Sequence, residues 1–159
     1  NNANLLASCI FFFFKIFPKH FTQGSVDGTI KFVDFRSEHG RNKAEATIKV
    51  GSVDVNVISW STASPNLIAS GSEDGSVQIW DIRYLSKARS VADIKFHTDQ
   101  ITSIEFQPYE DSIVTVASAD NRISVWDFSV EPDVKSKDDD IPDQLMFIHQ
   151  GIEDVKEIR

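Results

Sequence analysis

The chain contains the segment Gly71-Ser72-Glu73-Asp74-Gly75-Ser76-Val77-Gln78-Ile79-Trp80-Asp81-Ile82-Arg83, whose pattern predicts a strand, a tight turn and a second strand. Asp74-Gly75 is a strong hairpin signal, because a two-residue type I′ turn needs positive φ angles that Asp and Gly tolerate. Leu67-Ile68-Ala69 supplies apolar residues before the turn, and Val77-Gln78-Ile79-Trp80 supplies them after it. We therefore expect a β-hairpin around residues 74 and 75.

The hairpin pattern occurs three times in the chain. Its turn aspartates are Asp27, Asp74 and Asp120, which lie 47 and 46 residues apart. A repeat of this length with four short strands indicates the blades of a β-propeller. The sequence therefore predicts an all-β fold.

Blades of this kind bury their faces against neighbouring blades, so two or three of them cannot close a ring. The chain also begins with Asn1 rather than Met. We therefore expect a propeller fragment with about three of about seven four-stranded blades. Its expected parts are the end of one blade, two blades and the start of a last blade, at residues 1–45, 46–96, 97–150 and 151–159.

Residues 9–23 interrupt the first repeat with an apolar run rich in phenylalanine. Asn4-Leu5-Leu6-Ala7-Ser8 resembles Asn66-Leu67-Ile68-Ala69-Ser70, but only the second copy continues directly into its turn. We interpret residues 9–23 as an insertion between a strand and its turn. It is either a real insertion that docks on another surface or translated noncoding sequence. The run is too short to span a membrane, which takes about 20 residues.

Composition and charge narrow the classes of function. The 159 residues are 41% hydrophobic and carry a net charge of −8. An acidic surface repels phosphate backbones, which disfavours direct nucleic-acid binding and fits a basic partner such as a histone or ribosomal protein. The single cysteine, Cys9, excludes a disulfide framework within the chain. The histidines show no metal-ligand spacing, and we expect no metal, cofactor or membrane contact; they are His20, His39, His97 and His149.

Two Trp-Asp dipeptides, Trp80-Asp81 and Trp126-Asp127, end the second and third hairpins. With them the chain resembles the WD40-repeat family. The resemblance implies a buried network in each blade, in which a His, a Ser or Thr, the turn Asp and the Trp satisfy one another's hydrogen bonds. The third repeat supplies the complete set, namely His97, Ser118, Asp120 and Trp126.

The other two repeats lack part of this network. The second has Ser72, Asp74 and Trp80, but Gly51 stands where the histidine would align. The first has Ser25 and Asp27, with Val33 in place of the tryptophan. Although the set resembles a Ser-His-Asp triad, its blade-equivalent position implies a buried structural role, so we expect no enzyme.

The C-terminal part carries a closer resemblance. The stretch Asp138-Asp139-Asp140-Ile141-Pro142-Asp143-Gln144-Leu145-Met146-Phe147-Ile148-His149-Gln150-Gly151 is similar to the last inter-blade passage of two protein groups. One comprises glutamate-rich WD-repeat proteins, nucleolar factors that chaperone a ribosomal protein; the other comprises retinoblastoma-binding histone chaperones. The resemblance implies a nuclear, nucleolar chaperone whose contacts to a basic partner come from Asp138, Asp139, Asp140 and Asp143. His149-Gln150-Gly151 favours the ribosome-assembly group.

The charge of this passage supports that interpretation. Residues 131–143 contain six acidic and two lysine side chains, which give −4, half of the chain's net charge. Clustered carboxylates attract cationic partners in a salt-dependent way. The alternative is a solvated loop without a ligand.

A second interaction motif lies at the end of the second hairpin. Asp74, Trp80, Asp81 and Arg83 resemble the box by which some WD40 proteins dock on an adaptor of a cullin-type ubiquitin ligase. Arg83 could instead pair with a neighbouring carboxylate. A ligase adaptor and a general protein-interaction scaffold therefore stand as alternative functions.

Overall fold

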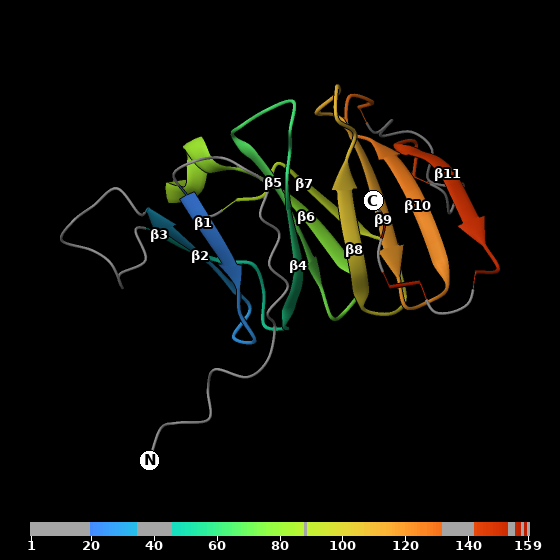
Figure 1. Ribbon diagram of the computed structural model, residues 1–159, viewed down its shortest axis with the longest axis horizontal. Helices are drawn as coiled ribbons and strands as arrows, with labels where there is room; N and C mark the ends of the chain where they lie inside the picture. The colour runs from blue at the N-terminus through green and yellow to red at the C-terminus, as the bar shows by residue number, and fades with distance from the viewer. Residues whose placement is uncertain are drawn as a thin grey trace, which may run out of the picture.

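The computed structural model describes residues 20–34, 46–87, 89–131, 142–152, 155, 156 and 158. These residues form three antiparallel sheets that lie side by side (Figure 1). The first sheet contains β1 (His20–Gly24), β2 (Thr29–Asp34) and β3 (Ala46–Lys49). The predicted all-β fold is confirmed, and no helix in the described part of the chain is long and apolar enough to cross a membrane.

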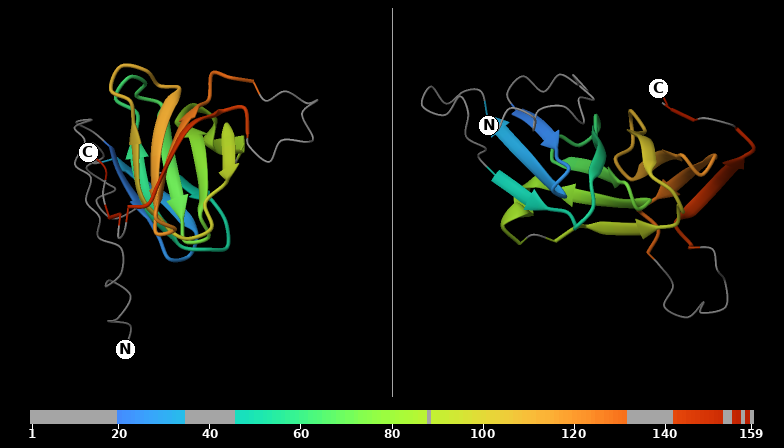
Figure 2. Two further views of the ribbon diagram at one scale, coloured as in Figure 1. Left: turned by 90° about the vertical axis from the view of Figure 1, so that its right-hand side faces the viewer. Right: turned by 90° about the horizontal axis from the view of Figure 1, so that it is seen from below.

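The second and third sheets each have four strands in meander order. The second comprises β4 (Val55–Trp60), β5 (Leu67–Ser72), β6 (Ser76–Asp81) and β7 (Ala92–Lys95), with the short 3-10 helix η1 (Ile82–Lys87) between β6 and β7. The third comprises β8 (Ile101–Phe106), β9 (Ile113–Ser118), β10 (Arg122–Asp127) and β11 (Leu145–Gln150). Two further views show the sheets fanned out without closing on one another (Figure 2).

The three hairpin turns share one geometry, which differs from the predicted type I′ turn. Four residues separate β1 from β2, and three separate the strands of each of the other two hairpins. In each turn only the last residue has a positive φ angle: Gly28 (71°), Gly75 (79°) and Asn121 (62°). Asp74 therefore does not adopt the left-handed conformation. Instead its Oδ1 accepts a hydrogen bond from Ser76 N at 3.1 Å, and Gly75 N donates to Ser72 O at 3.3 Å. This is the three-residue hairpin loop that ends in a left-handed residue.

Two apolar clusters hold the sheets together. Ile30 and Ile48 of the first sheet pack with Ile68 and Trp80 of the second. The other cluster joins the second sheet to the third, through residues that include Val77, Ile79, Ile94, Ile104 and Trp126. Full burial of each such side chain contributes about 1.5–3 kcal/mol, so every sheet depends on its neighbour for stability.

Gly71 permits the closest approach between the second and third sheets. A Cβ atom at this position would lie 2.5 Å from a side-chain carbon of Ile101 on β8. Because that distance is too short for any real Cβ contact, β5 and β8 could not pack this closely with a larger residue.

Two boundaries differ from the sequence-based division. Ala46–Lys49 pairs with β2 and so lies in the first sheet, whereas the division grouped it with residues 46–96. Residues 20–23, which we interpreted as part of an insertion, form most of β1 and pair in register with β2. The strand before the first turn is thus supplied by residues 20–24. Residues 1–19 lie outside the described part of the chain.

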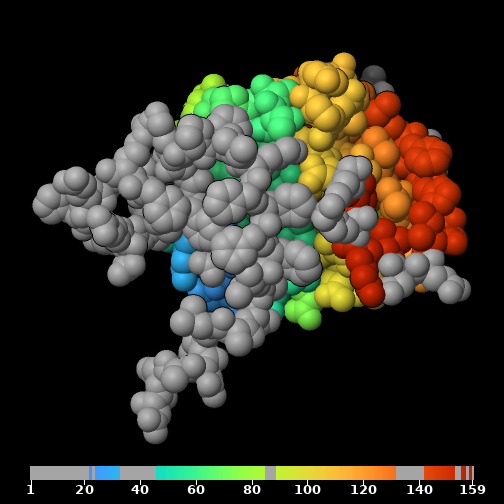
Figure 3. Space-filling model, in the orientation of Figure 1, coloured from blue at the N-terminus to red at the C-terminus, as the bar shows by residue number. Residues whose placement is uncertain are grey.

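The strands bring connections of two kinds to opposite ends of the sheets. We call the end with the three hairpin turns the turn end, and it is lowermost in Figure 1. The other end, called the loop end, carries η1 and residues 61–66, 107–112, 128–131 and 142–144. The outer strand β11 forms the right-hand rim of the molecule (Figure 3).

Candidate functional site

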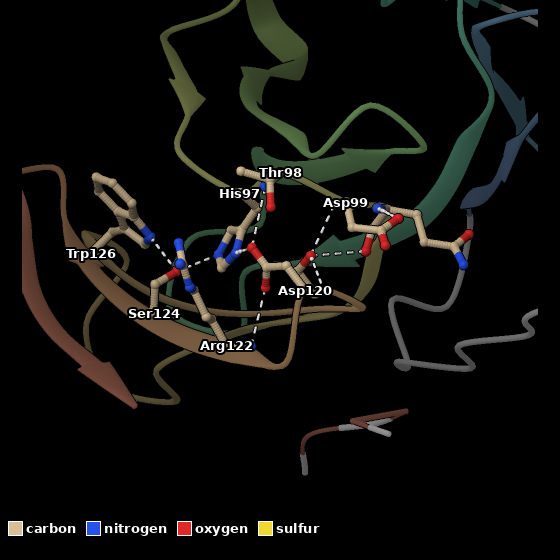
Figure 4. A network of polar contacts seen from close by, with 9 residues as sticks. His97, Thr98, Asp99, Asp120, Arg122, Ser124 and Trp126 are labelled. Carbon is tan, nitrogen blue, oxygen red and sulfur yellow. Dashed lines mark hydrogen bonds and ion pairs between the residues drawn. The ribbon is translucent and has the colours of Figure 1, made fainter. Parts of the chain in front are cut away.

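A buried hydrogen-bonded network of polar side chains lies near the turn end of the third sheet (Figure 4). His97, in the connection between β7 and β8, has its Nδ1 3.0 Å from Asp120 Oδ2 and its Nε2 2.7 Å from Ser124 Oγ. Trp126 Nε1 donates to the same Ser124 Oγ at 2.7 Å. The side chains of His97 and Asp120 are 0% and 5% exposed, so this network is shielded from water.

The pKa shifts of His97 and Asp120 indicate the protonation states of the two groups in this network. Burial lowers the pKa of His97 more than the carboxylate of Asp120 raises it, so the imidazole is neutral. Burial alone would raise the pKa of Asp120, but hydrogen bonds from His97, Thr98 N and Arg122 N outweigh it, and the pKa is lowered. Every group is then satisfied in one direction: the indole donates to Ser124, Ser124 to Nε2, and Nδ1–H to Asp120.

Ser124 occupies the place that the family pattern gave to Ser118. Ser118 Oγ instead donates to the carbonyls of Asp99 and Gln100 at 2.9 and 3.1 Å and accepts from Asp120 N at 3.2 Å. Ser118 therefore holds the connection before β8 against the turn. The serine that contacts histidine and tryptophan comes from β10, two residues before Trp126, and sequence alignment alone missed it.

The second sheet contains the same indole contact with its serine on the other strand. Trp80 Nε1 donates to Ser70 Oγ of β5 at 2.9 Å. Ser70 pairs with Gln78 across the strands, and the equivalent pair in the third sheet is Val116 with Ser124. The hydroxyl has thus moved from one member of a cross-strand pair to the other. Cross-strand register is the signal that could have identified Ser124 in the sequence.

The structure supports the predicted loss of the histidine in the second sheet. Gly51 follows β3 as His97 follows β7, and each backbone carbonyl lies over the turn glycine of the preceding sheet: a Cβ on Gly28 or on Gly75 would lie 2.4 Å from it. Asp74 therefore bonds only within its own turn in the interactions that the structure shows. Ser72, predicted to join this network, is buried at the end of β5.

The first sheet satisfies an indole by a third route. Trp60, on β4 of the second sheet, donates its Nε1–H to Thr22 Oγ1 of β1 at 2.9 Å. Asp27 accepts hydrogen bonds from Thr29 N and Oγ1 within its turn. The bond between Trp60 and Thr22 therefore links the two sheets directly.

The network at His97 has the residue types of a catalytic triad, but a substrate could not reach it. Ser124 is 0% exposed, and Phe96 packs edge-on against both Trp126 and His97 with ring centroids 5.4 Å apart. The Ser124 hydroxyl already forms hydrogen bonds with the His97 imidazole and the Trp126 indole. The arrangement fixes the position of the connection between the second and third sheets, which is a structural task.

Arg83 lies at the loop end, where η1 begins. Its Nε donates to Asp81 Oδ1 and Oδ2 at 2.9 and 3.1 Å, and its guanidinium lies over the Tyr84 ring, 5.7 Å from the centroid. The hydrogen bond from Arg83 lowers the pKa of Asp81. Arg83 therefore pairs with a neighbouring carboxylate, as one interpretation predicted, yet its side chain remains 62% exposed.

The acidic passage comprises residues 131–143, and its two described ends lie at the loop end of the third sheet. Glu131 and Asp143 are both exposed, and Asp138, Asp139 and Asp140 lie outside the described residues. Gln144 ties the two ends together, since its Nε2 donates to Val130 O at 3.2 Å and its carbonyl accepts from Asp127 N at 2.8 Å. Within the described part of the chain, no three His, Cys, Asp or Glu side chains gather as metal ligands.

Comparisons with known proteins agree with this geometry. The family model "WD domain, G-beta repeat" matches residues 44–81 and 88–127. The chain is 42% identical over 149 residues to "Ribosome assembly protein rrb1" of Schizosaccharomyces pombe, a match that covers 87% of this chain and 31% of the relative. It is 37% identical to "Protein HEAT STRESS TOLERANT DWD 1" of Arabidopsis thaliana, covering 64% of this chain and 34% of that protein.

A third relative and one solved structure complete the comparison. "Histone acetyltransferase type B subunit 2" of Debaryomyces hansenii is 34% identical over 104 residues, which cover 61% of this chain and 25% of the relative. A chain in the structure "Crystal Structure of Mitotic Checkpoint Complex" superimposes with a TM-score of 0.61 at 23% identity over 70% of this chain and 32% of that chain, a likeness of fold alone. The chain spans about a third of the length of the first two relatives and about a quarter of the third.

Proposed function

Because the chain belongs to the WD40-repeat family, we propose that it is part of a non-enzymatic chaperone or scaffold that binds a basic protein. The observation that carries this proposal is the 42% identity to a ribosome assembly protein, which extends over 87% of the chain. A ribosomal protein is therefore the first choice of partner, and a histone the second, since the match to the histone acetyltransferase subunit is lower and shorter. The proposed location is the nucleus, in particular the nucleolus.

The acidic passage supplies the proposed mechanism. Its carboxylates would neutralise the Lys and Arg side chains of the partner, with an attraction that weakens as salt rises. The hydrogen bonds of Gln144 support this role, because they close the base of the passage on a rigid sheet. The propeller sheets would then serve as the platform that presents the acidic side chains.

The proposal is tested by charge reversal in the passage. Purified large-subunit ribosomal proteins and core histones are titrated against the protein and the variant Asp139→Lys/Asp140→Lys. We expect the variant to bind at least about tenfold more weakly at low salt, because local charge is inverted. A variant that changes the same charge elsewhere, Glu73→Lys/Asp93→Lys, is the control, and we expect it to bind normally. Equal loss in both variants would reduce the mechanism to net charge.

A second function is favoured by one specific observation, the exposed and oriented guanidinium of Arg83. A side chain held by Asp81 and Tyr84 loses little conformational freedom when it docks. We expect the protein to bind a purified adaptor of a cullin-type ligase and Arg83→Ala to abolish that binding. The same variant should leave binding of basic proteins unchanged.

A further inference from the structure

The outer strand of the third sheet differs from the outer strands of the other two. β3 and β7 are four residues long and contain charges, Lys49 in one and Asp93 and Lys95 in the other. β11 is six residues long, and its sequence Leu145-Met146-Phe147-Ile148-His149-Gln150 contains no acidic residue, lysine or arginine. Among the described residues no further strand pairs with its outer edge, because β11 ends the sheet order.

The cross-strand register shows which positions have changed. Gln78 of β6 pairs with Asp93, and the equivalent Ser124 of β10 pairs with Ile148. Ile79 pairs with Ala92, while the equivalent Val125 pairs with Phe147. An aspartate and an alanine have thus been replaced by an isoleucine and a phenylalanine.

The apolar side chains of β11 are largely open to water. Met146 is 59% exposed and Phe147 is 56% exposed, and they occupy neighbouring positions on the strand. Phe147 also stacks on His149, with ring centroids 6.4 Å apart. In the space-filling view this strand forms the outer rim of the third sheet (Figure 3).

An exposed apolar edge strand is a template for another strand. Its outward N–H and C=O groups are available for pairing, and proteins ordinarily block such an edge with charges, as β3 and β7 do. A following blade would cover the face that carries Phe147 and His149, as the second sheet covers Ile48. It would leave the edge of β11 open, because that edge is the outermost part of its sheet.

We propose that β11 is a strand-addition site, at which an extended segment of the basic partner pairs as a fifth strand of the third sheet. The inference rests on the proposed function for the identity of the partner. Main-chain hydrogen bonds would supply affinity, and the side chains of Met146 and Ile148 would select alternate apolar residues. The partner segment carries Lys or Arg beside this apolar core.

Charge complementarity distinguishes this occupant from a second copy of the chain. β11 is preceded by Asp143 and the acidic passage and followed by Glu153 and Asp154. Antiparallel pairing of two β11 strands would place the acidic passage of one copy beside these acids of the other, and parallel pairing would place two acidic passages together. Both arrangements repel, whereas Lys or Arg at either end of a partner segment is attracted.

Hydrogen–deuterium exchange on the complex tests the proposal. The probes are purified large-subunit ribosomal proteins and core histones, each at ten times its dissociation constant. Amides of residues 145–150 that face outward should then exchange about tenfold more slowly, because they are hydrogen-bonded only in the complex. The variant Ile148→Asp copies Asp93 of β7, and we expect it to lose this protection and at least about tenfold in affinity.

The matched control is Thr47→Asp, which places the same charge at the equivalent exposed position of β3 and should bind normally. If Ile148→Asp does not fold by circular dichroism, Met146→Lys supplies the blocking charge at an exposed position outside the core. The inference is overturned if the protein binds a probe through Asp139 and Asp140 while the amides of β11 exchange equally in the free and bound states. That outcome leaves the proposed function intact, whereas binding of neither probe overturns both.

Discussion

The second and third sheets bury equivalent tryptophans but hold them differently. Trp80 donates to Ser70 on β5, and the Ser70 hydroxyl donates in turn to the backbone carbonyl of Gln78 at 3.4 Å. Trp126 donates to a serine on its own strand, which continues through His97 to Asp120. The difference teaches that the fold requires an acceptor for the buried indole N–H and does not require it from a particular strand.

The largest expected effect comes from deleting the two indoles. Trp126→Ala should lower the free energy of unfolding by about 3–5 kcal/mol through loss of burial and a cavity. Trp80→Ala should cost about 1 kcal/mol less, because only Trp126 packs edge-on against Phe96. Urea denaturation of both variants gives the comparison. Equal costs would show that the edge-on contact with Phe96 adds nothing measurable to the stability of the third sheet.

The position of the hydroxyl can be exchanged between the strands. Ser124→Ala should cost about 1–3 kcal/mol, since it leaves the buried indole and imidazole without their shared partner. The variant Val116→Ser/Ser124→Gln reproduces the Ser70–Gln78 pair of the second sheet and should recover part of that loss. Urea denaturation measures both. If the double variant is no more stable than Ser124→Ala, the two arrangements are not interchangeable.

The third sheet should respond to mild acid through His97, whereas the second sheet should not. Burial lowers the pKa of His97 below its ordinary value of 6.5, so the unfolded chain binds more protons as pH falls through that value. Stability from this group is complete above pH 6.5 and declines as pH falls toward the lowered pKa. The groups that face His97 are Asp120, which favours the proton, and Arg122, which opposes it.

Hydrogen exchange at pH 7 and pH 5 measures that decline for each sheet. Amides of β10 should lose protection relative to those of β6, which has no equivalent histidine. In the variant His97→Leu the two strands should show the same pH dependence. Any difference that survives in the variant would have to come from another titrating group. The lowered pKa of Asp120 acts below pH 3.8, outside this window.

The sequence predicted the features that depend on spacing and failed on those that depend on register. The interval between the turn aspartates was sufficient to identify the sheets, because the hairpins recur at nearly equal spacing along the chain. Ser118 was chosen over Ser124 because the linear pattern aligns it with the turn, whereas the network is formed across the strands. The first strand was misplaced because residues 20–23 continue an apolar run and carry no turn signal before Gly24. Asp138, Asp139 and Asp140 stay a prediction, as do their contacts to a partner.

The smallest effect expected is the addition of the missing histidine to the second sheet. A Cβ on Gly51 would meet no atom closer than Val53 N at 4.0 Å, so a Cβ atom can be accommodated there. Asp74 and Trp80 occupy the positions of Asp120 and Trp126 in the third sheet, and Ser70 supplies the hydroxyl that Ser124 supplies there. Gly51→His should therefore raise the free energy of unfolding by about 0.5–1.5 kcal/mol through its hydrogen bonds.

Gly51→Ala separates that gain from the loss of glycine's freedom in the unfolded chain, which alone stabilises by about 0.4–1 kcal/mol. Urea denaturation compares the two variants, and exchange of the β6 amides between pH 7 and pH 5 shows whether the new imidazole is buried. A histidine that stabilises more than alanine and makes β6 sensitive to acid would make the second sheet behave like the third. If histidine and alanine stabilise equally, the gain comes from the backbone alone and the imidazole makes no hydrogen bond that stabilises the second sheet. In that case the backbone of the connections at Gly51 and His97, and not one missing side chain, distinguishes the two sheets.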